Sequence, residues 1–583
     1  MLKRTDQSLE NRSNGAKDAF TGIRVDGLEL TSKIIGPLPI INPVLEQMGL
    51  LALYKDFVIS RGNHKLGHAD TLMILTRSIM IQREPVYELA EWSRHHDPQL
   101  LGLGGRDPKI LSDDRFARAL DQLFLADRAT MLTKLVLTVI DKFAVDVSQL
   151  HNDSTSVTGT GKYDVFSGLG SKRSTQLKRG HNKDHRPDLK QLVFTMTVSR
   201  DGAVPVHFKA YDGNVTDDKT HIETWNFLCL IVGGPDFTYV ADCKLCTKEQ
   251  MAHIHFRGGK FITIMPRSRS EDKAFREFLR SGQRPDWQEL LRRPNPENAA
   301  EEHIYYGFES PSLSAEGHRI IWVLSTQKRD FEAQTRKRKI DETIADLAKL
   351  KARIGSARLR SKEEITAAVT KAFEENGSVR WFDWQLVSKE TDAFKQIGKG
   401  RPGKETKYEK TTKVEWTFTA MPAYQRIADD AIDDGIFPLI TNHMVQEMTA
   451  REVLEKYKYQ PFLEKRHEKL KSVLEIAPMF FKRPHRIEAL MFVYFVSLMA
   501  SSLIEREIQI QMKKRQVTSL RLYPEARPCK HPTAERIFTV FGSQRRHTLT
   551  LDTMEVKTFH DPLSALHHQV LDLLGTSPAA YTG

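Results

Sequence analysis

The chain has 583 residues and is 40% hydrophobic, which is enough apolar material to fill the cores of about three or four domains. Lysine and arginine outnumber aspartate and glutamate by 87 to 75, a net charge of +12. This excess favours a polyanionic partner, because a basic surface gains affinity by neutralising phosphates. The four cysteines exclude a disulfide scaffold and indicate a reducing compartment, and the polar first residues predict no secretory signal.

Residues 1–143 are predicted to form a mostly helical domain that begins with a loose polar stretch. Apolar residues recur at helical spacing in segments 71–81, 115–125 and 129–142. No helix-turn-helix motif stands out among them. This region is therefore expected to be a helical domain of its own.

The pattern changes between residues 144 and 265, where short segments are rich in Val, Phe, Thr and Tyr, as strands are. The predicted strands are 144–150, 192–198, 204–208, 237–241 and 261–265. Asp201-Gly202 between the second and third of them is a hairpin signal, and 219–230 has a helical pattern. Strands followed by helices indicate an α/β core.

Two later segments have strong helical patterns. Segment 328–362 holds 12 Lys or Arg against 5 Asp or Glu around an apolar stripe, which predicts a basic amphipathic helix that either packs on a neighbour or contacts DNA. Segment 489–504 is uncharged over 16 residues, which is short of the about 20 needed to span a bilayer, so it predicts a buried core helix.

Two aspartates lie at predicted strand ends, where open α/β sheets place their ligands. Asp153 follows the first predicted strand and Asp242 closes the fourth. Each aspartate alone is equally compatible with a turn or a helix cap. The two together, in a basic chain, indicate a candidate site.

A third acidic residue, Glu464, lies on a predicted helix, one face of which carries polar and charged side chains. At 100° per residue, a stripe about 60° wide contains four residues: Tyr457, Gln460, Glu464 and Lys471. Leu463, Leu470 and Leu474 form an apolar flank that could pack on a sheet. Glu468 competes with Glu464 on spacing alone, and Pro461 either kinks or begins the helix.

These motifs together resemble the transposases of bacterial insertion sequences that use an Asp-Asp-Glu triad, in the group with a Tyr-Arg-Glu-Lys signature around the third acid. Tyr457, Glu464 and Lys471 keep the spacing of that signature, and Gln460 replaces its arginine. Further segments that resemble the family are 35–40, 180–191 and Gly213-Asn214 followed by Asp217.

The resemblance implies an α/β fold with an RNase H-like catalytic core, a mixed five-stranded sheet with helices on both faces. A mixed, partly β insertion precedes the third acid, with strands expected at 303–308, 320–324 and 414–419. The implied order begins with a helical N-terminal domain that binds DNA ends (1–143) and the first part of the core (144–265). The insertion (266–440) follows, then the second part of the core with the Glu464 helix (441–510), and last a C-terminal region for DNA contact or oligomerisation (511–583).

The resemblance also implies metal-dependent strand cleavage and strand transfer at the ends of an insertion sequence. Asp153, Asp242 and Glu464 are expected to hold Mg²⁺ or Mn²⁺, two ions with Asp153 as the bridge, because hard carboxylate oxygens suit these ions. The residues expected to contact phosphates are Tyr457, Gln460, Lys471 and Lys458. The expected partners are double-stranded DNA, as terminal inverted repeats and target, and further copies of the chain in a homodimer or higher oligomer. No membrane is expected, and the location is the bacterial cytoplasm, at the nucleoid.

Two other functions stay open at this point. One is a transposase-derived DNA-binding protein that no longer catalyses, for which the lost arginine at position 460 leaves room. The other is a tyrosine recombinase with Tyr457 or Tyr459 as nucleophile, which would need an Arg-His-Arg cluster that the sequence does not assemble.

Overall fold

A computed structural model describes residues 24–582 except 26–27, 61–64, 160–167, 181–187, 216–219, 296–297, 299–300, 357–358, 474–482 and 553. The chain forms two compact units. One consists of Met1–Phe261 with Lys456–Gly583, and the other of Ile262–Glu455. We call them the first unit and the second unit.

The first unit contains a mixed sheet with the strand order β8-β3-β6-β7. Its strands are β3 (Gln149–Gly159), β6 (Lys190–Ser199), β7 (Pro205–Asp212) and β8 (Thr238–Ala241). β3 pairs antiparallel with β6, β6 pairs antiparallel with β7, and β8 pairs parallel with β3. Nine of the ten residues of β6 are buried, so both faces of the sheet are covered.

The predicted strands at 192–198, 204–208 and 237–241 are confirmed, and the hairpin at Asp201-Gly202 joins β6 to β7. The first predicted strand, 144–150, is wrong. Ala144 ends a helix with a φ of 47°, and β3 begins only at Gln149. As a result, Asp153 lies inside its strand, paired with Met196, and does not follow the strand.

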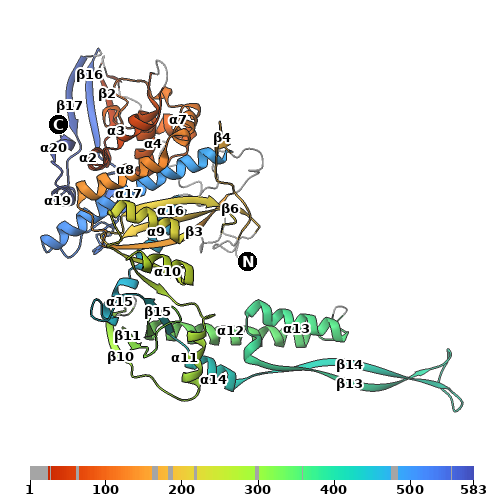
Figure 1. Cartoon of the computed structure of the whole chain (residues 1–583). Helices are drawn as coiled ribbons and strands as arrows, with labels where there is room; N and C mark the ends of the chain where they lie inside the picture. Colours follow the sequence, from red (N-terminus) through yellow and green to blue (C-terminus); the bar gives the residue numbers. More distant parts are fainter. Residues whose placement is uncertain are drawn as a thin grey trace. The chain divides into compact units, whose positions relative to one another are not determined.

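Helices pack against this sheet (Figure 1). The helix α16 contacts β3 and β6, while α17 and α8 contact β7. The helices that follow or cover the strands are α9 (His221–Val232), the short η4 (Cys243–Leu245), α10 (Lys248–Phe256), α16 (Gln460–Val473) and α17 (Pro484–Lys514). α15 (Ala450–Tyr457) precedes α16 in the chain and begins in the second unit.

The N-terminal part is helical as predicted, and segments 71–81, 115–125 and 129–142 lie in α4, α7 and α8. Its helices are α2 (Leu38–Gln47), α3 (Leu50–Phe57), α4 (His68–Ile81), η1 (Val86–Glu88), α5 (Leu89–His95), α6 (Pro98–Leu101), η2 (Pro108–Ile110), α7 (Asp113–Leu125) and α8 (Arg128–Phe143). They do not form a compact unit separate from the sheet, because α17 packs against α2, α4 and α7 as well as against β7.

The buried core helix predicted at 489–504 is confirmed as part of α17. Within the described residues, α17 is the one helix long and apolar enough to cross a membrane, and 83% of its most apolar stretch is buried inside the protein. Its apolar surface is therefore covered by other parts of the chain.

A second sheet pairs strands from the two ends of the described chain. Residues 24–25 and 28–34 form strands of this sheet, so the expectation of a loose polar start is wrong for them. Its order is β1-β2-β16-β17, with β2 antiparallel to β16 from Leu28↔Leu551 to Ile34↔Arg545. The strands are β1 (Arg24–Val25), β2 (Leu28–Ile34), β16 (Arg545–Leu551) and β17 (Met554–His560). The remaining elements of the unit are β4 (Gly168–Leu169), β5 (Lys172–Arg173), α18 (Ala534–Phe541), α19 (Ala565–Leu573) and α20 (Ala579–Thr582).

The second unit combines antiparallel strands in the order β10-β11-β12-β15-β9 with helices and a long two-stranded ribbon. The strands are β9 (Lys260–Ile264), within which the two units meet in sequence, β10 (Gln288–Pro294), β11 (Glu302–Glu309), β12 (Arg319–Ser325) and β15 (Ile436–Thr441). The helices are α11 (Ser270–Arg280), α12 (Thr326–Ala352), α13 (Lys362–Asn376), η5 (Val379–Trp381) and α14 (Tyr424–Ile432). The ribbon consists of β13 (Phe382–Gln396) and β14 (Tyr408–Pro422). Strands predicted at 303–308, 320–324 and 414–419 lie in β11, β12 and β14.

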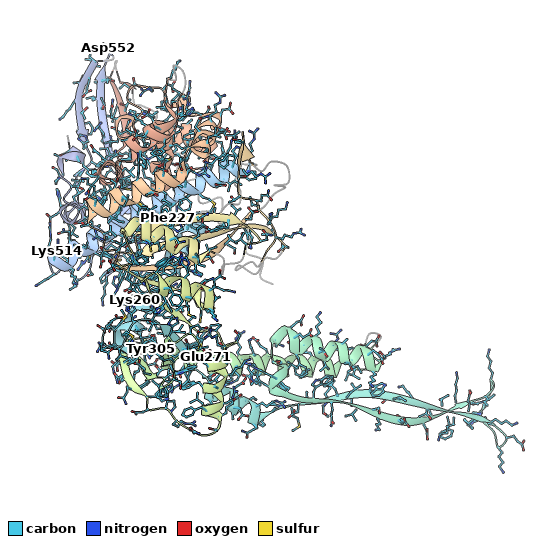
Figure 2. All side chains as sticks on the ribbon, in the orientation of Figure 1. Phe227, Lys260, Glu271, Tyr305, Lys514 and Asp552 are labelled. Carbon is cyan, nitrogen blue, oxygen red and sulfur yellow. The ribbon has the colours of Figure 1, made fainter. Side chains whose placement is uncertain are left out.

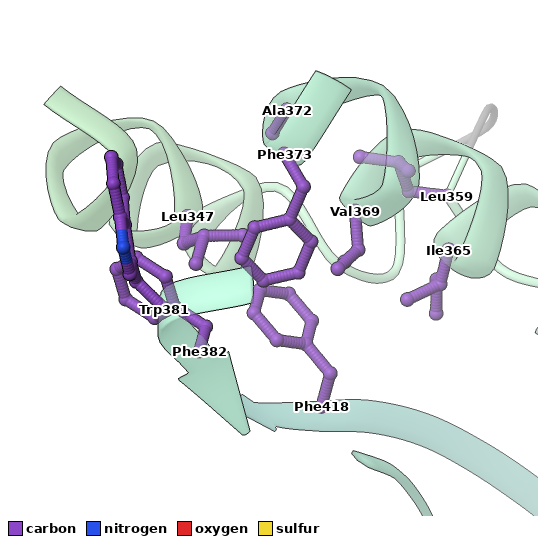
Figure 3. Close-up of a cluster of buried hydrophobic side chains, with 9 residues drawn as sticks. All are labelled: Leu347, Leu359, Ile365, Val369, Ala372, Phe373, Trp381, Phe382 and Phe418. Carbon is purple, nitrogen blue, oxygen red and sulfur yellow. The ribbon is translucent and has the colours of Figure 1, made fainter. Parts of the chain in front are cut away.

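An apolar cluster joins α12, α13 and the base of the ribbon (Figure 3). The basic helix predicted at 328–362 is confirmed over 328–352 as part of α12, which ends at Ala352, before the predicted end. Leu347 of α12 packs with Val369 and Phe373 of α13 in this cluster. Phe382 of β13 and Phe418 of β14 complete it, so the ribbon is anchored at its base.

Candidate active site

The first two acidic residues are brought together by the parallel pairing of β3 and β8. That pairing runs to Asn152↔Ala241, and the next residues along the two strands are Asp153 and Asp242. Asp153 Oδ1 accepts a hydrogen bond from the Ser154 amide at 2.8 Å, and Asp242 Oδ1 accepts one from the Lys244 amide at 3.0 Å as it caps η4. Backbone donors therefore fix one oxygen of each carboxylate at the same end of two neighbouring strands.

The third acid is supplied by α16, but the helix is not the continuous one predicted. α15 ends at Tyr457 and α16 begins at Gln460, with Pro461 in its first turn, where a missing amide hydrogen costs nothing. Tyr457 and Gln460 therefore do not share a helical stripe. The apolar flank is confirmed for Leu463 and Leu470, which are 0% and 1% exposed, while Leu474 lies outside the described residues.

The pKa of the Tyr457 hydroxyl is affected by all three acidic residues. Its pKa is raised above the ordinary value first by burial and then by the nearby negative groups Asp242, Cys243, Glu464 and Asp153. All three carboxylates therefore lie within electrostatic range of the Tyr457 phenol. Glu464 is among them, which favours it over Glu468 as the third member of the site.

The sequence predicts that Gln460 contacts a phosphate. In the structure its side chain is only 8% exposed and is therefore not available for that contact. His151 Nδ1 lies 2.8 Å from Gln460 Oε1, and Gln460 Nε2 donates to the Asn152 carbonyl oxygen at 3.3 Å. Gln149 Nε2 is 2.6 Å from His151 Nε2. We call the residues 149, 151 and 460 the Gln-His-Gln chain.

Burial lowers the pKa of His151 to about 4, so this imidazole is neutral. Because the Gln149 amide can only donate to Nε2, the proton of the ring is on Nδ1 and is donated to Gln460 Oε1. The Gln-His-Gln chain therefore ties the first residue of α16 to β3, two positions before Asp153.

His467 is a site residue that sequence reasoning missed. Its Nδ1 lies 3.6 Å from Asp153 Oδ2, and its side chain is 7% exposed. The sequence contained a sign of this role, because His467 follows Glu464 by three positions and residues with that spacing lie on the same face of a helix. Its Nε2 is buried without a hydrogen-bond partner among the described residues.

A buried ion pair anchors the other side of α16. Arg466 donates to the carbonyl oxygens of Gly202 and Ala203 at 2.9 and 3.0 Å, in the turn between β6 and β7. It also donates to Glu505 of α17 at 2.5 Å, and Lys469 donates to the same carboxylate at 2.5 Å. The helix that carries Glu464 is therefore held by the sheet and by α17 together.

Several predicted residues are placed only in part. Lys458 is half-buried between α15 and α16. Lys471 lies in α16, but its side chain is outside the described residues, as are residues 181–187 of the 180–191 segment and Asp217. Among the described residues, no group of three or more His, Cys, Asp or Glu side chains is drawn together closely enough to hold a metal ion.

Comparison with known proteins gives weak structural similarities. No family model and no curated protein matches the chain. One similar structure is described as a piggyBac transposase synaptic complex with hairpin DNA, at 11% identity over 50% of this chain and 59% of that one, with a TM-score of 0.22. Another is a Mos1 transposase paired-end complex with the left transposon end, at 7% identity over 35% and 60% of the two chains, with a TM-score of 0.14. The chain covers less than two thirds of either, and similarities this low assign it to no family.

Proposed function

We propose that this chain is a DNA transposase of the Asp-Asp-Glu type, which cleaves DNA strands at the ends of a mobile element and transfers them to a target. The observation that carries the proposal is the parallel pairing of β3 and β8, which puts Asp153 and Asp242 at the same end of two neighbouring strands, together with the packing of the Glu464 helix α16 against β3. Three acids from distant parts of a chain with a net charge of +12 suit chemistry on a polyanion.

The strand order supports an RNase H-like core for this site. Three antiparallel strands, β3, β6 and β7, are followed by the helix α9 and by β8, which returns to lie parallel beside β3. The two aspartates come from the two strands that this connection makes neighbours. The second unit stands in the chain between Asp242 and Glu464, where the family resemblance implies an insertion.

The carboxylate oxygens of Asp153, Asp242 and Glu464 are donors of the kind that Mg²⁺ or Mn²⁺ prefers, so these three residues would hold the ions once their side chains close on them. When bound, the ions polarise the phosphodiester and steady the leaving oxygen. The backbone hydrogen bonds to Asp153 and Asp242 hold one oxygen of each carboxylate at the ends of the two strands.

The protein's neutral and positive groups would position the DNA. Tyr457 can donate its hydroxyl hydrogen to a phosphate oxygen, and Lys458 and Lys471 can supply charge. The N-terminal helices are proposed to bind the terminal inverted repeats. Because two ends must be paired, the proposed working form on DNA is a homodimer or a higher oligomer.

A tyrosine recombinase is disfavoured by the surroundings of its two candidate nucleophiles. Burial and three carboxylates raise the pKa of Tyr457, which opposes the phenolate needed for attack. Burial raises the pKa of Tyr459 to about 12, and its ring stacks on Phe462 with centroids 4.5 Å apart. The second candidate function is a DNA-binding protein without catalysis. The replacement of the family's arginine by Gln460 no longer supports it, because Gln460 has a structural role in this fold.

The test is strand cleavage of DNA that carries the inverted repeats bounding the coding sequence, in Mg²⁺. Asp153→Ala should lose cleavage while it binds the ends as the unaltered protein does. Asp236→Ala, an exposed aspartate just before β8, is the matched control and should cut normally. Full cleavage by Asp153→Ala, or cleavage that persists in excess EDTA, would refute the proposal.

A further inference from the structure

The ribbon of the second unit is unusually long for two strands. β13 and β14 pair without interruption from Phe382↔Pro422 to Gln396↔Tyr408, fifteen residues on each strand. At about 3.3 Å per residue the ribbon spans about 50 Å. It extends away from α12 and α13 as a bare pair of strands (Figure 1, Figure 2).

Only the base of the ribbon is packed. Residues 388–395 of β13 and 408–415 of β14 are exposed, and we call residues 388–415, including the connecting tip, the arm. The arm exposes large apolar side chains, since Phe394, Ile397 and Tyr408 are 65%, 59% and 50% exposed. An isolated two-stranded ribbon is at best marginally stable in water, so the arm has the form of an element that acts against a partner.

The charge of the arm indicates the kind of partner. The tip, residues 397–407, carries Lys399, Arg401, Lys404 and Lys407 against the single acid Glu405. None of these four cations forms an ion pair with another residue that the structure describes, whereas Lys410 farther down the strand is paired with Asp392 at 2.8 Å. Uncompensated positive charge at an exposed tip attracts a polyanion.

Two exposed aromatic residues lie just below the tip, and one of them, Tyr408, directly follows the tip residue Lys407 in the chain. Directly opposite residues of an antiparallel pair share a face, so Phe394 lies with Lys410 and Tyr408 with Gln396 on one side of the ribbon. Cations next to exposed aromatic rings are typical of nucleic-acid surfaces, where the charges bind phosphates and the rings contact sugars and bases. A two-stranded ribbon also has the width that the major groove of DNA admits.

We propose that the arm is a duplex-DNA-binding element, which lies in a groove with the four tip cations on phosphates. The inference rests on the proposed function for its choice of DNA as the polyanion. A second copy of the chain is the less suitable occupant of the tip, because two such tips repel each other.

The experiment measures the affinity of the full chain for a duplex longer than the arm at several salt concentrations. In the arm variant, Lys399, Arg401, Lys404 and Lys407 are all changed to Gln. The matched control changes Lys273, Arg293, Lys371 and Arg451 to Gln, which removes the same charge from exposed positions on α11, β10, α13 and α15. The slope of log affinity against log salt should fall by about 3 to 4 in the arm variant, at about 0.9 for each lost phosphate contact.

The control should keep the original slope. Equal losses in the two variants would overturn the proposal, because overall charge would then explain the effect, and an unchanged slope in the arm variant would also overturn it. A variant that loses self-association without DNA, at an unchanged slope, would show that the arm binds another copy. These outcomes are separate from the cleavage test, since Asp153→Ala with an intact arm keeps the full salt dependence whether or not it cuts.

Discussion

Replacing Gln460 with alanine should destabilise the first unit and leave the affinity for DNA intact. The amide of Gln460 is 8% exposed and joins two partners, the imidazole of His151 at 2.8 Å and the carbonyl oxygen of Asn152 at 3.3 Å. His151 itself is 0% exposed, so no water can replace the lost acceptor. The substitution therefore leaves a buried N–H of the Gln-His-Gln chain unpaired.

The magnitude follows from these two bonds. A buried donor left without its acceptor costs about 1 to 3 kcal/mol, and the longer bond to Asn152 contributes about 0.5 to 1 kcal/mol, so we expect a loss of about 2 to 4 kcal/mol. Gln460 begins the helix that carries Glu464. If the helix shifts by about 1 Å as a result, strand cleavage should fall about 100-fold.

The assay is urea unfolding of the full chain, together with hydrogen exchange of the β3 amides, which should lose protection. Gln425→Ala on α14 is the control, because that exposed glutamine bonds only to Asp429 within the described residues and its loss should stay within about 0.5 kcal/mol. Gln460→Ala with unchanged stability and a tenfold weaker affinity for DNA would refute this reasoning and restore the phosphate contact predicted from the sequence.

Two further predictions concern α16 and its supports. Glu464→Gln should abolish Mg²⁺-dependent cleavage, whereas Glu468→Gln should not. The assay is the nicking of DNA that contains the element ends. Inactivation by the Glu468 change alone would show that the wrong acid was chosen. Burial alone would raise the pKa of Glu505, but Arg466 and Lys469 outweigh burial and lower it below the ordinary 4.5. Its stabilisation is therefore complete above pH 4.5 and is lost as the pH falls through the lowered value. Glu505→Gln should cost about 3 to 5 kcal/mol at pH 7 in urea unfolding, since Arg466 stays buried without its partner. The difference should shrink as the pH falls below 4.5, and an equal difference at both pH values would contradict the pairing.

The strands with continuous apolar runs could be predicted from the sequence, and β3 could not be placed correctly. β6 and β8 are bounded almost as expected, because most of their buried residues are apolar or β-branched. In β3 the polar residues His151, Asn152 and Thr155 are buried too. Thr197 Oγ1 of β6 donates to Asn152 Oδ1 at 2.9 Å across the sheet. A buried polar strand has no hydrophobic period to detect.

The candidate site shows the same division. Helical spacing gave the apolar flank of α16 correctly, because that flank depends only on residues near one another in the chain. It could not show that Gln460 bonds to His151, 309 positions away, or that α16 restarts after Tyr457. Partners across the fold decide whether a polar residue faces the DNA or the interior.

The pairing of β2 with β16 has a consequence for the life of the polypeptide. Thr31 and Thr548 lie in register although they are 517 positions apart, so during synthesis the edge of β2 stays open until β16 has been made. Open strand edges are sites of aggregation. A chain that stops before residue 545 would keep that edge of β2 exposed.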